Sequence, residues 1–455
     1  MKISFHGAVR QVTGSCFMLQ TRDIQGKEYN LLIDCGMYQG QSECDNYNYE
    51  DFGFDPQNIH CVFITHAHAD HTCRLPKLVK EGFTGNIYLT QSCFELTKLI
   101  IDDAKNIMEE NAKACAQDFL FEQIDVDRVY EQTQFVQYHE PIVIAPGITV
   151  EFFNAGHILG SAFICITSEN KKIIFSGDIG NDNVPILPDT EHIESADIVV
   201  CESTYGNRIH EDFGERSRKL RECIENTIKN NSVLMIPAFS IERTQELLYE
   251  FDRMLQKDLK TRIPIYLDSP MAIRATSIYR KYKDSLEFDV PILEEPDQDF
   301  FSFSNLTETL SSGASKHINN VPGPKIIIAG SGMMSGGRIL HHASRYLPNS
   351  NNTLLIIGYQ ADNTIGRQII EGAKAVDIFG KMVDVKATVK AIGAFSAHGD
   401  KNKLTKWLRP DDNKEPQKVF LVHGDEDAKL DFAAHLKTQL QSEIIIPALS
   451  EKFEI

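Results

Sequence analysis

Four side chains that commonly bind metals fall within six residues of this chain, directly after an apolar run. The run is Cys61-Val62-Phe63-Ile64, and the cluster reads His66-Ala67-His68-Ala69-Asp70-His71. Polar groups taken from water without partners cost roughly 2 to 7 kcal/mol each, so this cluster is costly at the end of a buried strand unless a cation pairs with it. The small Ala67 and Ala69 let His66 and His68 project to one side. Asp70 and His71 can then turn toward a second ion. The pattern predicts a strand that delivers a dinuclear metal site, and the alternative is a solvated polar loop.

Length and composition are typical of a large globular enzyme. With 455 residues, 42% of them hydrophobic and 24% charged, the chain is expected to form two or three domains. Its formal net charge of -18 disfavours a general nucleic-acid coat protein, which neutralises phosphates with Lys and Arg, but leaves room for a nuclease with a local basic groove. No signal peptide is visible, and no run approaches the roughly 20 apolar residues of a membrane span. We therefore expect a cytoplasmic protein without a membrane segment, whose ten scattered cysteines are reduced.

The predicted elements divide the chain into three parts. Strands and helices mix in residues 1–207, regular β-then-α units occupy residues 208–376, and strands return in residues 377–455. Alternating β and α units imply a largely parallel sheet flanked by helices. Because histidine motifs lie in both outer parts, we expect the middle part to be a domain inserted into the one that carries the metal chemistry. Apolar spacing predicts helices at residues 92–115, 216–229, 241–255, 271–282, 337–346 and 431–440, strands at 233–237, 264–267, 325–329, 353–358 and 383–392, and an irregular stretch at 287–324.

Further candidate ligands follow predicted strands and stand beside glycine or another small residue. Strand ends on one rim of a sheet can converge on a point, and a neighbouring glycine lets the backbone and a substrate come close. A single histidine in such a place is often an ordinary polar residue, but repetition at six places favours a shared site. The six residues are Asp34, His157, Asp178, Glu202, His398 and His423.

A glycine-rich segment between a predicted strand and helix is a candidate anion site. It reads Gly330-Ser331-Gly332-Met333-Met334-Ser335-Gly336-Gly337, and its backbone N–H groups could contact a phosphate, with Ser331, Gly332 and Met333 as the candidate contacts. Arg243 and Arg338 are candidate supporting cations, although ordinary salt-bridged arginines are the alternative.

On these residues the chain resembles the metallo-β-lactamase superfamily and, within it, the β-CASP branch of RNA-processing nucleases. The cluster of residues 66–71, with Asp34, His157 and Asp178, resembles the metal motifs of the superfamily, and Glu202, His398 and His423 resemble the three extra motifs of the branch. The segments 237–246, 268–271 and 330–338 also resemble the β-CASP domain. The branch includes the cleavage and polyadenylation endonuclease subunit and RNase J, and this chain resembles its minimal bacterial form. The resemblance implies an α/β fold, an αββα sandwich with an inserted α/β domain.

The resemblance also implies roles for the candidate residues. Two Zn²⁺ ions, with Mn²⁺ as the alternative, would lower the pKa of a shared water that attacks phosphorus. His398 would be the general acid for the leaving 3′-oxygen, with Glu202 beside it, and the products would carry a 5′-phosphate and a 3′-hydroxyl. Asp34 would accept hydrogen bonds from the histidine loop. One zinc would be held by His66, His68 and His157 and the other by Asp70, His71 and His423, with Asp178 bridging.

The expected substrate is single-stranded RNA, cut by an endonuclease that could also act as a 5′ exonuclease, and the expected assembly is a monomer or weak homodimer. A DNA-processing member of the same branch is one rival, but the DNA-repair members carry an apolar residue at the last motif, where this chain has His423. A non-nuclease metallo-hydrolase of the lactamase fold is another, although it would not need the inserted domain. A catalytically dead binding subunit would be expected to have lost ligands, and this chain lacks none.

Overall fold

The chain folds into two compact units in the computed structural model, which describes residues 1–40, 47–257, 263–287, 299–361, 363–410 and 414–455. Unit 1 comprises residues 1–182, 188–209 and 398–455, and unit 2 comprises residues 183–187 and 210–397. Unit 2 therefore interrupts unit 1 in the sequence. The inserted domain is predicted to end at residue 376, whereas unit 2 continues to Ala397 because β19, its last strand, pairs within the unit 2 sheet.

Unit 1 is built from two seven-stranded sheets. The first has the order β22-β1-β2-β3-β4-β5-β6 and the second has the order β21-β20-β11-β10-β9-β8-β7. Strands β1, β2 and β3 pair antiparallel in sequence order and form a β-meander. The first sheet contains β1 (Lys2–Phe5), β2 (Phe17–Arg22), β3 (Glu28–Ile33), β4 (Cys61–Phe63), β5 (Asn86–Thr90), β6 (Thr133–Val136) and β22 (Lys452–Glu454). The second contains β7 (Ile142–Ala145), β8 (Ile148–Asn154), β9 (Ala162–Ser168), β10 (Lys171–Phe175), β11 (Ile198–Glu202), β20 (Lys418–Val422) and β21 (Glu443–Ile445).

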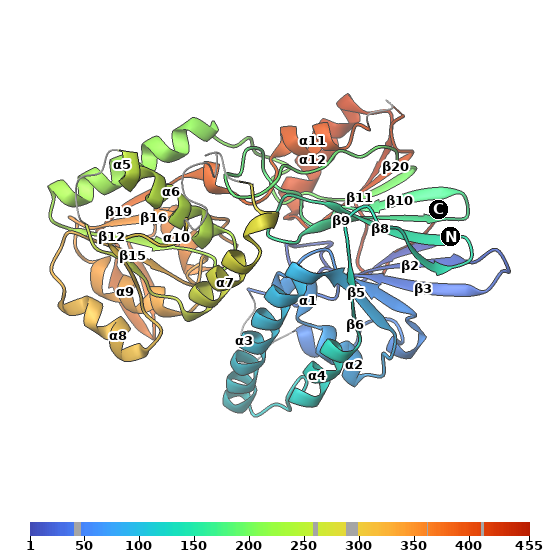
Figure 1. Ribbon diagram of the computed structural model, residues 1–455, viewed down its shortest axis with the longest axis horizontal. Coiled ribbons are helices and arrows are strands. Elements are labelled where there is room, and N and C mark those ends of the chain that lie inside the picture. The colour runs from blue at the N-terminus through green and yellow to red at the C-terminus, as the bar shows by residue number, and fades with distance from the viewer. Residues whose placement is uncertain (41–46, 258–262, 288–298, 362, 411–413) are drawn as a thin grey trace. The chain divides into compact units, whose positions relative to one another are not determined.

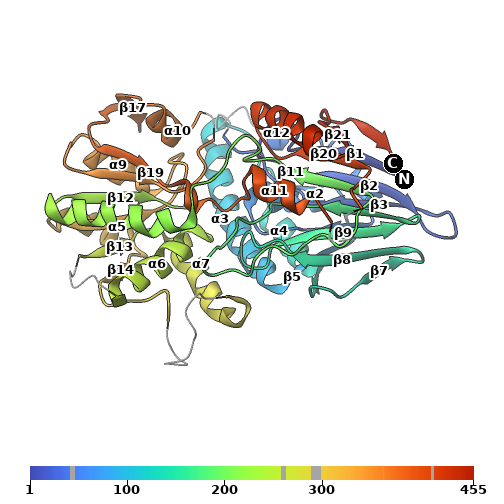
Figure 2. The same cartoon turned by 90° about the horizontal axis from the view of Figure 1, so that it is seen from above.

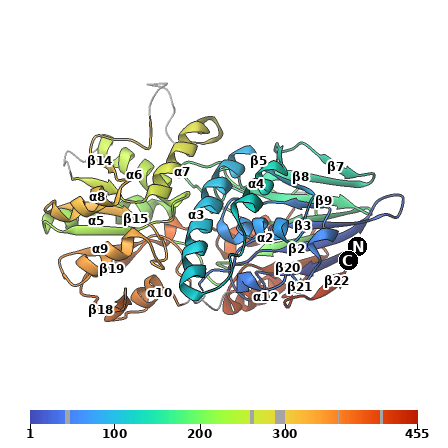
Figure 3. The ribbon, with the colours of Figure 1, turned by 90° about the horizontal axis from the view of Figure 1, so that it is seen from below.

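Helices cover both outer faces of these sheets, so unit 1 is an αββα sandwich (Figure 1). Figure 3 shows α2, α3 and α4 in front of the first sheet, and Figure 2 shows α11 and α12 over the second. One buried cluster joins the facing sides of the two sheets and includes Phe5, Phe63 and Phe175. Another joins the second sheet to its helices through Trp407 and Phe432. The helices are α1 (Ala69–Thr72), α2 (Leu75–Lys80), α3 (Gln91–Cys115), α4 (Gln123–Glu131), α11 (Lys401–Trp407) and α12 (Glu426–Gln439), with the 3₁₀ turns η1 (Tyr47–Tyr49) and η2 (Pro56–Asn58).

Unit 2 is a six-stranded sheet of order β14-β13-β15-β12-β16-β19, in which every strand pair is parallel. Helices α5 and α6 lie on one face and α9 on the other (Figure 1). The strands are β12 (Val233–Pro237), β13 (Ile265–Leu267), β14 (Leu306–Glu308), β15 (Lys325–Ala329), β16 (Thr353–Ile356) and β19 (Thr388–Ala391), and a separate hairpin joins β17 (Ala375–Ile378) and β18 (Lys381–Asp384). The helices are α5 (Phe213–Lys229), α6 (Arg243–Lys257), α7 (Pro270–Lys281), α8 (Ser312–His317), α9 (Arg338–Tyr346) and α10 (Ile365–Ile370), with the 3₁₀ turns η3 (Lys283–Ser285), η4 (Ile318–Asn320) and η5 (Gly393–Phe395).

Most predicted elements are confirmed, and the differences have local causes. The predicted strand at 383–392 is two strands, because β18 pairs with β17 whereas β19 pairs with β16. The predicted irregular stretch at 287–324 contains β14, α8 and η4, and its residues 288–298 lie outside the described part. Eight described cysteines are free, but Cys115 is disulfide-bonded, so the expectation of reduced thiols is wrong for that residue. Among the described residues, no helix is both long and apolar enough to cross a membrane.

Candidate metal centre

The histidine motifs of unit 1 follow strands of both sheets. His66 and His68 follow β4, and α1 then carries Asp70 and His71, whereas His157, Asp178 and His423 follow β8, β10 and β20 of the second sheet. Close packing under these loops constrains their backbone: Gly177 has φ +53°, and a Cβ there would lie 2.6 Å from the Cβ of Thr65. Such a position favours glycine, because other residues rarely adopt this φ.

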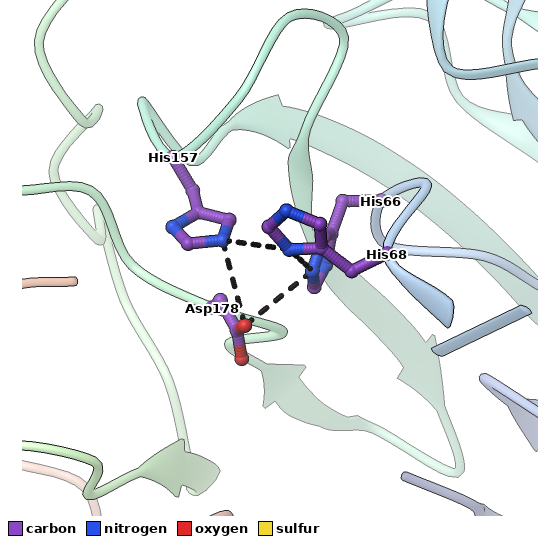
Figure 4. Close-up of side chains that lie close together, drawn as sticks. All are labelled: His66, His68, His157 and Asp178. Carbon is purple, nitrogen blue, oxygen red and sulfur yellow. Dashed lines mark hydrogen bonds and ion pairs between the residues drawn. The ribbon is translucent and has the colours of Figure 1, made fainter. Parts of the chain in front are cut away.

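The first group of converging atoms comes from three imidazoles and one carboxylate (Figure 4). Nδ1 of His68 lies 3.1 Å from Nε2 of His66 and 3.2 Å from Nε2 of His157. Oδ2 of Asp178 lies 3.4 Å from Nε2 of His66 and 3.5 Å from Nε2 of His157. One nitrogen of each ring and one carboxylate oxygen therefore point at a common centre.

The second group lies beside the first and also contacts Asp178. Nε2 of His423 lies 3.4 Å from Nε2 of His71 and 3.3 Å from Oδ2 of Asp70. The other oxygen of Asp178, Oδ1, lies 3.5 Å from Nε2 of His71. Asp178 thus presents one oxygen to each group, as a bridging ligand would.

These separations fit tetrahedral coordination of a cation. Four ligands at about 2.0 to 2.1 Å from a tetrahedral zinc lie about 3.3 to 3.4 Å from one another. The separations of 3.1 to 3.5 Å between the ligand atoms fall around that value in both groups. Oδ1 of Asp178 is buried and accepts no hydrogen bond from the residues that the structure describes, which is expensive for a carboxylate unless a cation compensates it. The donor set therefore fits one divalent metal in each group.

Two threonines and Asp34 orient the imidazoles. Asp34 accepts from Nδ1 of His71 at 2.7 Å and from both the backbone N–H and the hydroxyl of Thr65 at 2.8 Å. The hydroxyl of Thr65 lies 3.1 Å from Nδ1 of His66, and that of Thr204 lies 3.1 Å from Nδ1 of His423. Because these partners occupy Nδ1, the Nε2 atoms are left to face the common centres. Sequence reasoning found Asp34 but missed both threonines, whose only signal is their place directly beside the ligand motifs.

His398 and Glu202 form a third group beside the first two. Nδ1 of His398 lies 3.2 Å from both oxygens of Glu202 and 3.8 Å from Oδ2 of Asp178. Glu202 is fully buried and also accepts from the backbone N–H of Ile179 at 2.7 Å. Backbone bridging between Gly180 and His398 fixes the loop that carries the imidazole. The structure therefore places a histidine, oriented by a buried carboxylate, next to both candidate metal groups.

The carboxylates give this region a strongly negative potential. Burial alone would lower the pKa of His71, but Asp178 and Asp34 outweigh burial and raise that pKa to about 10. Burial is likewise opposed at His398, where Glu202 and Asp178 raise the pKa to about 8, so this imidazole carries a proton at neutral pH. In His66, burial and the neighbouring His71 lower the pKa. A site of this kind attracts cations and also holds a proton at a defined nitrogen.

The two arginines predicted to support a phosphate are engaged by groups of unit 2 itself. Arg338 donates to a carboxylate oxygen of Asp268 at 2.7 Å and to two backbone carbonyl oxygens at 2.8 Å. Arg243 is buried and donates to Glu246 and to the carbonyl oxygen of Phe395 at 2.5 Å. Both guanidinium groups are therefore salt-bridged to carboxylates of unit 2, which is the alternative interpretation of these arginines.

The glycine-rich loop of unit 2 satisfies part of its own backbone. The hydroxyl of Ser331 accepts from the N–H groups of Ser335 at 3.0 Å and Gly336 at 3.2 Å. Gln360 donates to the carbonyl oxygen of Gly332 at 2.9 Å. Within the described part of the chain, no hydrogen bond occupies the N–H groups of Gly332 and Met333. Those two amides are among the donors that the loop still offers to an anion.

Three family models match successive parts of the chain. The metallo-β-lactamase superfamily matches residues 10–197, the Beta-Casp domain matches residues 244–369, and the Zn-dependent metallo-hydrolase RNA specificity domain matches residues 382–447. A solved protein of unknown function from Enterococcus faecalis shares the fold, with a TM-score of 0.57, 11% identity and 99% coverage of both chains.

Curated relatives match nearly the whole chain. Ribonuclease TTHA0252 of Thermus thermophilus is 37% identical over 94% of both chains. An RNase J-like protein of Methanocaldococcus jannaschii is 30% identical over 98% of this chain and 97% of its own. Subunit 3-I of the cleavage and polyadenylation specificity factor of Arabidopsis thaliana is 28% identical over 99% of this chain and 63% of its own. The chain therefore belongs to the β-CASP branch of the metallo-β-lactamase superfamily, a branch of metal-dependent hydrolases.

Proposed function

We propose that this protein is a zinc-dependent ribonuclease that hydrolyses phosphodiester bonds. The observation that carries the proposal is the pair of ligand groups that share Asp178, at separations suited to tetrahedral zinc, with a carboxylate-paired histidine beside them. A hydrolase acting on a phosphodiester needs both a charged centre for the phosphoryl oxygens and a proton donor for the leaving oxygen. Relatives over nearly the full chain include one named as a ribonuclease.

One metal would be held by His66, His68 and His157 and the other by Asp70, His71 and His423, with Asp178 shared. When bound, two zinc ions lower the pKa of coordinated water to near neutrality and stabilise the negative charge on phosphoryl oxygens. Asp34 and Thr65 keep the imidazoles in the orientation that presents Nε2, through the hydrogen bonds already described. A site whose ligands are held in place needs little rearrangement when substrate arrives.

His398 is the proposed general acid. Its Nδ1 is held by Glu202 at 3.2 Å, and Nε2 is the ring nitrogen from which a proton would pass to the leaving 3′-oxygen. The products are a 3′-hydroxyl and a 5′-phosphate. In unit 2, the N–H groups of Gly332 and Met333 are the proposed contacts for the phosphate backbone, because Arg338 donates to Asp268 and to two carbonyl oxygens and Arg243 is buried beside Glu246.

We propose single-stranded RNA as the substrate, with internal cleavage as the main mode and 5′ exonuclease activity as a second one. RNA is favoured over DNA because the DNA-repair members of the branch carry an apolar residue where this chain has His423, whose Nε2 lies 3.3 Å from Asp70 in the second ligand group. The protein is proposed to act as a monomer or weak homodimer in the cytoplasm, with manganese as the alternative metal.

Metal analysis together with a substrate panel tests this function. The panel contains the same RNA labelled at the 5′ or the 3′ end, single-stranded DNA of the same sequence, and a lactam. We expect about two zinc ions per chain, cleavage of RNA in preference to DNA, and internal fragments with both labels. Turnover of the lactam alone would overturn the ribonuclease proposal, and release of mononucleotides from the 5′ label alone would show that exonuclease activity is the main mode.

A further inference from the structure

A cationic hollow lies on unit 1 between α11, α12 and the loop after β10, and none of the candidate metal ligands is among its lining residues. It has a volume of about 410 Å³. The residues that line it include four that carry or can carry positive charge, and no Asp or Glu is found among the described ones. The lining consists of His192, Asn402, Thr405, Lys406, Arg409, Pro410, His435 and Gln439.

Lys406 and Arg409 of this hollow form no ion pair with any carboxylate among the residues that the structure describes. By contrast, Lys403 and Lys414, close to them in sequence, pair with Asp182 and Asp197. Arg409 donates instead to the backbone and side-chain oxygens of Gln439, at 3.1 and 3.2 Å. Partial burial, Lys401 and Arg409 all lower the pKa of His435, which is the sign of a positive local potential. The hollow is therefore electrostatically suited to an anion.

The residues that line the hollow favour a polymer over a small molecule as its ligand. Pockets for small molecules are enclosed and mainly apolar, whereas here five of the eight lining side chains are exposed and Pro410 is the one apolar member among the described residues. The exposed five are His192, Asn402, Lys406, Arg409 and Gln439. An open, polar and cationic hollow suits a phosphate backbone that passes across it, with imidazole and guanidinium planes available to stack on bases.

The hollow is also close in sequence and space to the catalytic groups of the same unit. Helix α11 begins at Lys401, directly after the loop of His398, and supplies the lining residues at positions 402, 405 and 406. A seven-residue helix is about 10 Å long. Measured along the helix axis, these lining residues therefore lie less than that distance from the start of α11. Figure 2 shows α11 and α12 together over the second sheet of unit 1. A strand bound at the metal centre and extending a few nucleotides could therefore reach the hollow.

We propose that this hollow is an accessory site for the phosphate backbone of RNA, in which Lys406 and Arg409 contact phosphates outside the metal centre. The proposal rests on the proposed ribonuclease function. The shared chemistry is a phosphate group, which a free nucleotide or inorganic phosphate also offers. The site should raise the affinity for long RNA without taking part in the chemical step.

The test compares Lys406→Ala/Arg409→Ala with Lys437→Ala/Lys171→Ala, which removes two cations of unit 1 outside the hollow. Binding is measured by fluorescence anisotropy with a labelled RNA of about 25 nucleotides, in proteins that also carry His398→Ala so that the RNA is not cut. Cleavage is measured in proteins that keep His398, with the same RNA and with one of about 5 nucleotides. For the hollow variant we expect about ten-fold weaker binding of the long RNA and a salt slope reduced by about 1.4, since each lost phosphate contact removes about 0.7 from the slope of a single strand. KM for the long RNA should rise, whereas kcat for both RNAs and KM for the short RNA should stay unchanged, and the control variant should resemble the wild type.

Two further variants protect the test against misfolding and against a local partner. Because Arg409 also bonds the end of α12, Lys406→Glu alone should reproduce the loss of binding with an unchanged melting temperature. Asp411 and Asp412 follow the hollow in sequence and lie outside the described residues. The effect of Lys406→Glu should persist in an Asp411→Asn/Asp412→Asn background, and its disappearance there would overturn the proposal, because Lys406 would then serve those carboxylates.

The remaining outcomes separate this proposal from the ribonuclease proposal. If the wild type cleaves RNA and the hollow variant binds and cleaves long RNA as well as the control does, the accessory site is wrong and the ribonuclease stands. If the wild type binds long RNA through Lys406 and Arg409 but cuts none, the ribonuclease proposal fails while the site stands. If the hollow variant loses affinity for AMP or inorganic phosphate but keeps its affinity for long RNA, the site serves a free ligand and the proposal is overturned.

Discussion

The two units bury the same kinds of side chain and use them differently. In unit 2, Asp268 accepts from His342 and Arg338 at 2.7 Å, from Ser315 at 2.6 Å and from Thr309 at 2.5 Å. In unit 1, an oxygen of the equally buried Asp178 accepts no hydrogen bond from the described residues, and imidazole nitrogens face one another around it. A saturated carboxylate stabilises the fold, whereas one with converging, unsatisfied lone pairs is arranged for something that the chain itself does not supply.

The largest expected effect comes from Asp178→Asn, which removes the charge shared by both ligand groups. An amide cannot offer two anionic oxygens, so we expect loss of at least one metal per chain and a fall in turnover of about 10⁴-fold or more. Metal content and RNA cleavage measure this, and circular dichroism checks that the fold is kept. A variant that held both metals and cleaved normally would show that the unsatisfied carboxylate is not a ligand.

His398→Ala separates proton donation from metal binding. The ring contacts Glu202 and lies beside Asp178 but belongs to neither proposed metal group. We expect unchanged metal content and kcat lowered by about 10²- to 10⁴-fold, the usual contribution of a general acid. The loss should be smaller for an RNA whose leaving oxygen is replaced by sulfur at the cut site, since a thiolate leaves without protonation. An equal loss with both substrates would contradict the acid role.

Asp268→Ala tests the saturated cluster of unit 2. The change leaves Arg338 and His342 without their buried partner, which should cost about 3 to 5 kcal/mol of unfolding free energy for that unit. Asp299→Ala is the matched control, because its pair with Arg280 is about one-third exposed and should be worth less than about 1 kcal/mol. Denaturant unfolding followed by probes in each unit measures both, and metal content should not change in either variant.

Asp268 also determines the direction in which the stability of unit 2 changes with pH. Burial raises the pKa of Asp268, but its hydrogen bonds from His342, Ser315, Thr309 and Arg338 outweigh burial and leave the pKa well below its usual range. The stabilisation is therefore complete above the unfolded-state pKa of about 3.9 and is lost as the pH falls below it. Wild-type unit 2 should lose stability below about pH 4, and Asp268→Ala should flatten that part of the curve.

The convergence of the ligand motifs in unit 1 is easier to predict from sequence than the partners of the arginines in unit 2. Strand-end histidines and carboxylates are readable because each follows an apolar run, and the structure brings His66, Asp178 and distant His423 together. Whether an arginine is free depends on partners far away in the chain, such as Asp268 for Arg338, 70 residues apart. No local pattern carries that information. The hollow beside α11 was missed for the same reason, because it needs two helices and a loop to form.

The smallest effect is expected from Thr65→Val, which tests how much the orientation of the ligands, as opposed to their identity, contributes to metal affinity in unit 1. Thr65→Val keeps the size of the side chain and the backbone bond to Asp34, but it removes a hydroxyl that lies 2.8 Å from Asp34 and 3.1 Å from Nδ1 of His66. His66 can then present either nitrogen, so metal affinity should fall by about 10- to 100-fold, the usual cost of losing such a partner. Competition with a chelator measures the affinity. Thr21→Val removes a buried hydroxyl bonded to Ser168 at 2.7 Å, away from the ligands, and should lower stability without changing that affinity. If Thr65→Val bound metal as tightly as the wild type, β4 and α1 alone would fix the imidazole of His66. The difference between the two units would then lie in the metal ligands and not in the residues that orient them.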